Sequence, residues 1–86
     1  MGLSGLCFQK GDVVLLPEGF RVRKLGTSFG SYTLHKAEQA EVYSHEGGKL
    51  LLYRDYDLWV AYRRVWTDDL KQLSPMEQLA HALETE

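Results

Sequence analysis

The sequence has little cysteine and no long apolar run, and each absence excludes a class of protein. Cys7 is the one cysteine among 86 residues, so no internal disulfide can form, which is typical of the reducing cytoplasm. No apolar run approaches the roughly 20 residues that a transmembrane helix needs. The first eight residues also lack the basic start and apolar stretch of a signal peptide. We therefore expect a cytoplasmic protein with no membrane partner.

The sequence also lacks an overall excess of basic charge, because it contains 10 Lys and Arg but 12 Asp and Glu residues. This balance argues against binding of nucleic acid, which usually requires a clearly basic domain. The charges are unevenly placed, however. Residues 1–36 carry five basic and two acidic side chains, whereas residues 67–86 carry one basic and five acidic ones. The sequence thus has a basic front part and an acidic tail.

No constellation of residues has the spacing of a catalytic or metal-binding motif. His35, His45 and His81 are scattered, and Cys7 lies far from all three. The position of Cys7 favours a small apolar side chain rather than a nucleophile. Asp55 and Asp57 flank a turn, where Asp is favoured for its hydrogen bonds to the backbone. We therefore expect a protein that is not an enzyme and needs no metal or other cofactor.

The length and the 44% hydrophobic content predict a single domain with one modest core. Within this domain the sequence predicts three segments: a loose arm over residues 1–9, a β-rich unit over residues 12–66 and a C-terminal helix over residues 74–84. The strongest strand signal lies in Lys49–Arg54 and Leu58–Trp66. In the first run Leu50 and Leu52 share one face, because successive side chains of a strand point to opposite sides.

Weaker strand signals come before and between these runs. Val13–Leu16 and Phe20–Leu25, joined by the turn residues of Pro17–Gly19, predict a hairpin. Tyr32–His35 and Gln39–Tyr43 are further strand candidates, although residues 36–41 fit a helical turn equally well. Glu46–Gly48 predicts a hairpin turn into the Lys49 strand.

The end of the chain carries the signals of a helix. Ser74 and Glu77 form a capping box around Pro75, which predicts a helix over Pro75–Glu84. An apolar stripe follows one face of this helix at helical spacing and consists of Met76, Leu79, Ala80 and Leu83. The stripe either closes an open end of the β-rich unit or packs on a second copy of the chain.

Together these elements predict a mainly β (β+α) fold with five to six strands and a C-terminal α-helix. Two architectures satisfy that pattern: a small SH3-like barrel and a strongly bent antiparallel sheet. A barrel has the advantage that it leaves no sheet edge exposed.

Part of the sequence resembles a group of small bacterial SH3-like barrel domains of unknown function. The similarity lies in Ser44–Glu46, Leu51–Arg54 and Leu58–Val60, with Val65-Trp66 at the place of the closing Met-Phe of that pattern. Ala61-Tyr62 stands where those domains have Arg-Pro. The resemblance implies a small barrel and carries no activity, because a fold does not determine a function.

Aromatic and arginine side chains are the remaining functional signal. Ten aromatic residues are more than 86 residues can bury deeply, and aromatics and Arg are the types enriched at binding hot spots. We expect a small accessory protein, of the kind that phages and other mobile elements encode, which binds a protein partner or a second copy of itself. The alternative is binding of RNA or single-stranded DNA through a strand surface. The expected binding residues are Arg21, Arg23, Phe29, Tyr56, Tyr62, Arg63, Arg64 and Trp66.

Overall fold

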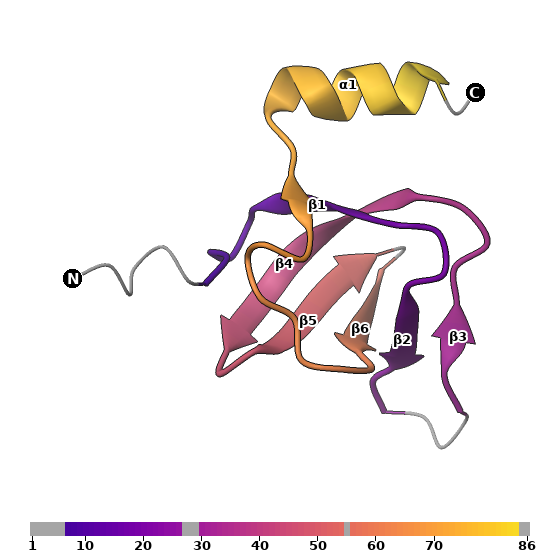
Figure 1. Cartoon of the computed structure of the whole chain (residues 1–86), viewed down its shortest axis with the longest axis vertical. Helices are drawn as coiled ribbons and strands as arrows, with labels where there is room; N and C mark the ends of the chain where they lie inside the picture. Colours follow the sequence, from indigo (N-terminus) through magenta and orange to yellow (C-terminus); the bar gives the residue numbers. More distant parts are fainter. Residues whose placement is uncertain (1–6, 27–29, 55, 85–86) are drawn as a thin grey trace.

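Seven antiparallel strands and one helix form the part of the chain that the computed structural model describes, which is residues 7–26, 30–54 and 56–84 (Figure 1). The elements are β1 (Val13–Leu16), β2 (Arg21–Lys24), β3 (Tyr32–Thr33), β4 (Glu38–Glu46), β5 (Lys49–Arg54), β6 (Asp57–Ala61), β7 (Lys71–Gln72) and α1 (Pro75–Glu84). The prediction of a mainly β fold with a C-terminal helix is confirmed. The sequence missed β7, which is too short to show an alternating pattern.

The strands form one sheet in the order β3-β2-β6-β5-β4-β1-β7. Every neighbouring pair is antiparallel. Within the described residues β3 and β7 are the edges, so the sheet does not close on itself. The best-predicted part is the hairpin of β4 and β5, whose turn uses Gly47 and Gly48 at φ values of 58° and 85°. Positive φ is easy only for glycine, so this turn follows from the local sequence.

The predicted hairpin between Val13–Leu16 and Phe20–Leu25 is wrong. β1 pairs with β4 and β7, whereas β2 pairs with β3 and β6. The turn after Pro17 carries the chain from one part of the sheet to another, and its Gly19 amide donates to Leu34 O at 2.9 Å. A short turn therefore connects two strands that are not neighbours in the sheet.

Other strand boundaries also differ from the prediction: β3 ends at Thr33 rather than His35, and β4 continues to Glu46. The strand expected over Leu58–Trp66 ends at Ala61, because Val65 leaves the ladder and its amide donates to Gly48 O at 2.8 Å. Residues 38–41, which fitted a strand or a helical turn, belong to β4 and pair with β1. Tertiary pairing decided both outcomes: it ended the Leu58 strand early, and it selected a strand where the local pattern of residues 36–41 allowed a helical turn as well.

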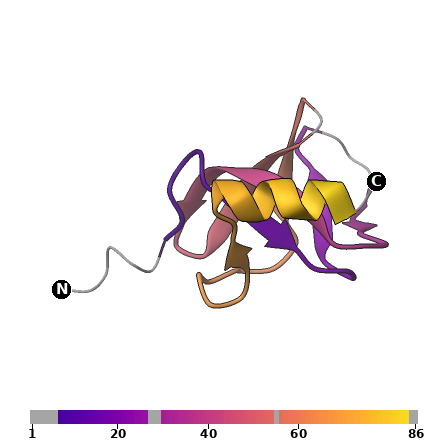
Figure 2. The ribbon, with the colours of Figure 1, turned by 90° about the horizontal axis from the view of Figure 1, so that it is seen from above.

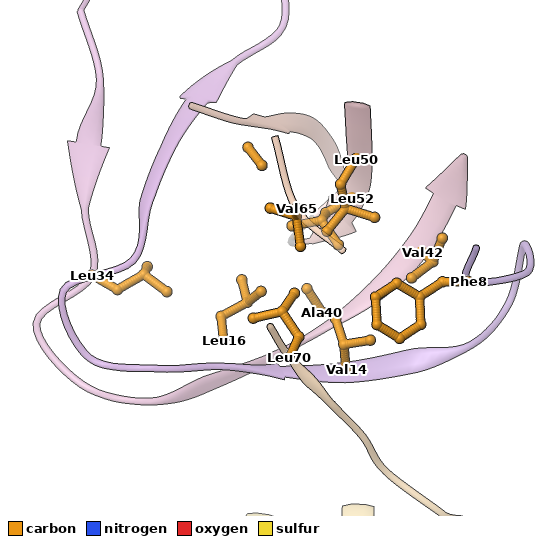
Figure 3. Packing of buried hydrophobic residues seen from close by; sticks show 11 residues of the cluster. Phe8, Val14, Leu16, Leu34, Ala40, Val42, Leu50, Leu52, Val65 and Leu70 are labelled. Carbon is orange, nitrogen blue, oxygen red and sulfur yellow. The ribbon is translucent and has the colours of Figure 1, made fainter. Parts of the chain in front are cut away.

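The core lies inside the curve of the sheet. Figure 3 shows side chains of β1, β4 and β5 pointing toward Leu34, Val65 and Leu70 from the connecting segments. Leu50 and Leu52 are fully buried and Tyr53 is exposed, as the alternation along β5 predicts. The cluster consists of Phe8, Val14, Leu16, Leu34, Ala40, Val42, Leu50, Leu52, Ala61, Val65 and Leu70.

His45 is the buried polar side chain of this core. The amide of Phe8 donates to His45 Nδ1 at 2.9 Å, and Nε2 lies 2.7 Å from Val65 O. Because Nδ1 accepts a hydrogen bond, Nε2 carries the proton and donates to the carbonyl. Most of the predicted loose arm lies outside the described residues, but Phe8 near its end is buried and held by His45.

The helix α1 begins with the predicted capping box. Ser74 N–H donates to Glu77 Oε1 at 2.9 Å, and Glu77 N–H donates to Ser74 Oγ at 3.2 Å. Lys71 Nζ lies 3.0 Å from the other Glu77 oxygen. The backbone hydrogen bond from Ser74, followed by the Lys71 ammonium, lowers the pKa of Glu77 from 4.5 to about 2, since both favour the carboxylate.

We expect His45→Ala to lower the free energy of unfolding by about 2–4 kcal/mol, because it opens a cavity and leaves a buried N–H and C=O without partners. Urea denaturation measures this loss. The matched control is His35→Ala, at an exposed position, which should change stability by less than about 0.5 kcal/mol. Equal effects of the two substitutions would contradict the structural role of His45.

The lowered pKa of Glu77 makes its contribution to stability depend on pH. A carboxyl group whose pKa is lower in the folded state stabilises that state above its ordinary pKa and loses this effect as the pH falls through the folded value. Wild type should therefore be more stable than Glu77→Gln above pH 4.5, and the difference should close as the pH falls toward about 2. Urea denaturation of both proteins over this range checks it, and a difference independent of pH would contradict it.

Candidate functional site

Five of the residues expected to bind a partner lie together at the ends of β2 and β6. We call them the arginine–tyrosine surface: Arg21, Arg23, Tyr62, Arg63 and Arg64. In β2 the buried Val22 separates Arg21 from Arg23, so both arginines point to the outer face. The Tyr62 amide donates to Arg21 O at 2.9 Å, which joins the end of β6 to the start of β2.

The segment after β6 is held from its buried side. Val65 is buried, its amide donates to Gly48 O, and its carbonyl accepts from His45. Arg64 Nη1 donates to Gly47 O at 3.0 Å. These bonds tie the segment after β6 to the β4–β5 turn and to His45, and Tyr62, Arg63 and Arg64 are exposed on this constrained segment.

Arg21 and Tyr62 contact each other directly. The Arg21 guanidinium carbon lies 4.3 Å from the centre of the Tyr62 ring, which is a cation–π arrangement. Arg21 Nε also donates to Ser31 Oγ, next to β3. Tyr62 remains 52% exposed, so Arg21 covers only part of the ring.

Two hollows meet at Tyr62, Arg63 and Arg64, which line both. The first, of about 440 Å³, has apolar walls from Phe20, Val65 and Leu70, with Arg21 and Asp69 also in its lining. The second, of about 320 Å³, adds the charged side chains Arg23 and Lys49 and no acidic residue. Both hollows therefore carry Arg63 and Arg64. The first adds the larger apolar side chains, and the second adds more positive charge; below they are called the apolar and the basic hollow.

The positive charge of this surface has no acidic partner in the described part of the chain. The ion pairs there join Lys24 to Asp57, Arg54 to Glu38 and Lys71 to Glu77. Lys49 and the four arginines of the surface belong to none of these pairs. A chain with a net charge of −2 thus gathers half of its ten basic side chains around one site.

The other three expected binding residues are not part of this surface. Trp66 borders it and packs on Gly48, where an added Cβ would lie 3.0 Å from the Trp66 ring. Tyr56 is 91% exposed, with a φ of 68°, but it lies in the β5–β6 turn at the other end of β6. Phe29 lies outside the described residues. The sequence therefore grouped residues that the fold separates.

Sequence reasoning also missed contributors to the site. Lys49 shares the basic hollow with Arg23, and Phe20 lines the apolar one. The exposed position of Lys49 is predictable, since it alternates with the buried Leu50. The proximity of Lys49 to Arg63 is not predictable from the sequence. It arises because the segment after β6 packs against the β4–β5 turn, where the Val65 amide donates to Gly48 O.

A second exposed feature is the apolar stripe of α1. Met76, Leu79 and Leu83 are 82%, 63% and 66% exposed, and Ala80 is exposed as well. No residue of the helix is buried. The alternative that the stripe closes an open end of the β-rich unit is therefore wrong.

Polar contacts attach α1 to the sheet. Gln39 Nε2 donates to Gln78 O at 2.9 Å and lies 3.0 Å from His81 Nδ1. Gln78 and His81 thus face β4, and the stripe lies on the other side of the helix. Figures 1 and 2 show α1 lying over one end of the sheet, after the short link from β7.

No group of three or more His, Cys, Asp or Glu side chains within the described residues could hold a metal ion. His45 is part of the core, while His35 and His81 lie elsewhere on the surface. The described residues also include no helix long and apolar enough to span a bilayer. No protein-family model, curated protein or solved structure matches this chain. The resemblance to SH3-like barrel domains remains a prediction.

Proposed function

We propose that this chain is a non-enzymatic binding protein that acts through the apolar stripe of α1, with a second copy of itself as the partner. The observation that supports the proposal is the exposure of all four stripe residues, Met76, Leu79, Ala80 and Leu83, on a helix that attaches to its own sheet by polar contacts. The proposal does not depend on an SH3-like architecture.

The free energy of an exposed stripe favours association. Covering a Leu or Met side chain contributes about 1.5–3 kcal/mol when burial is complete. A helix of ten residues is also marginal on its own, since isolated helices below about 12 residues rarely persist in water. In this chain the capping box and Gln39 support α1, and packing of the stripe on a partner would add to both.

A second copy is a suitable partner because two-fold pairing places one stripe on the other. The charge next to the stripe permits this arrangement, since Lys71 pairs with Glu77 in the first turn and reduces repulsion between the helices. The interface remains small, because a standard interface involves about 20–30 residues on each side. We therefore expect a weak dimer that dissociates on dilution.

The test is Leu79→Glu, which places a charge in the middle of the stripe. Sedimentation velocity over a range of protein concentrations should show a monomer–dimer equilibrium for wild type and a folded monomer for the variant. The control is Gln72→Glu, which adds the same charge at an exposed position of β7, outside α1, and should dimerise like wild type. A wild-type protein that stays monomeric at the highest concentration would contradict self-association.

A further inference from the structure

The arginine–tyrosine surface combines charge and shape in a way that the α1 stripe does not explain. Five cationic side chains line its two hollows, and Asp69 is the acidic residue in their linings. The Asp69 carboxylate already accepts the Trp66 amide at 2.7 Å, so one of its oxygens is engaged within the protein. The local charge is therefore strongly positive, although the chain as a whole is acidic. Such a surface attracts an anionic ligand.

The two hollows differ in the ligand group that each would accept. The basic hollow, with Arg23, Lys49, Arg63 and Arg64, offers guanidinium and ammonium donors that suit phosphate oxygens. The other hollow is also lined by arginines, but its Phe20, Tyr62 and Leu70 offer apolar surface and a partly exposed aromatic ring that suit a flat base. Since the hollows share Tyr62, Arg63 and Arg64, one ligand with alternating phosphates and bases can occupy both.

A single strand fits this arrangement better than a duplex or an acidic peptide. In a duplex the base faces are stacked on one another, so they cannot reach a protein ring. An acidic peptide would use the arginines but has no need of Tyr62. A single strand uses both features, because it exposes its bases to aromatic side chains and its phosphates to a basic groove.

We infer that the arginine–tyrosine surface binds single-stranded nucleic acid, with backbone phosphates in the basic hollow and a base against Tyr62 in the apolar one. This function is additional to self-association through α1. Figure 1 shows α1 far from the end of β6, so the two surfaces can be occupied independently.

Fluorescence anisotropy with labelled single-stranded RNA and DNA of about 12 nucleotides tests the inference, since one such binding surface covers about 4–16 nucleotides. For the wild type, a plot of the logarithm of the association constant against the logarithm of the salt concentration should be linear. Its slope should be about −0.7 for each phosphate that the protein contacts. The variants should keep the far-UV circular dichroism spectrum of the wild type.

Two substitutions separate the phosphate site from the base site. Arg63→Ala should weaken binding about tenfold and make the salt slope shallower by about 0.7–1, because one phosphate contact is lost. Tyr62→Ala should weaken binding about fivefold or more and leave the slope unchanged, because stacking releases no counterions. Tyr62→Phe keeps the ring and should bind like wild type. Lys36→Ala removes a basic charge from an exposed position outside both hollows and should have no effect.

Three results would overturn the inference. The first is no binding of either oligonucleotide at low salt. The second is wild-type affinity in Tyr62→Ala together with equal binding of poly-glutamate, which would show a general anion surface. The third is loss of binding in Leu79→Glu, which would place the contact on α1. Wild-type affinity of Leu79→Glu for the oligonucleotides supports the inference. The experiments therefore test nucleic-acid binding and self-association through α1 separately.

Discussion

The structure depends most on the two hydrogen bonds of His45. This side chain of β4 accepts from the Phe8 amide and donates to the Val65 carbonyl, both inside the core. It therefore joins a segment before β1 and a segment after β6 to the end of β4. Because an unpaired polar group in this place would be unfavourable, the bonds select one arrangement of the three segments. The arginines next to Val65 are exposed as a consequence.

Segregation of charge gives this small chain two dissimilar surfaces. The arginine–tyrosine surface gathers Arg21, Arg23, Arg63 and Arg64, and Lys49 adds to it in the basic hollow. At the far end of the molecule α1 carries its apolar stripe beside Glu77 and Glu84 (Figure 1). A net charge of −2 conceals this division, because opposite charges in separate places cancel in the total but not in the local field.

The helix shows how a correct sequence pattern can have an unexpected tertiary role. The capping box and the spacing of Met76, Leu79 and Leu83 predicted both the helix and its apolar face. An apolar face usually lies against the core. In this chain Gln39 holds Gln78 and His81 instead, so polar residues face the sheet and the apolar face points to the solvent. The pattern identified the stripe, and only the packing shows that its own sheet leaves it uncovered.

The sequence by itself determined the features that depend on neighbouring residues: the alternation of Leu50 and Leu52 in β5, the glycine turn before it and the capped helix. Residue type also pointed to all five residues of the arginine–tyrosine surface, although not to Lys49 and Phe20 beside it. Tertiary structure decided that β1 and β2 do not pair, that β6 ends at Ala61 and that Lys49 joins Arg63 while Tyr56 does not. The reason is physical: a turn or a cap is stabilised within about four residues, whereas strand pairing and the closure of a site depend on contacts between distant parts of the chain.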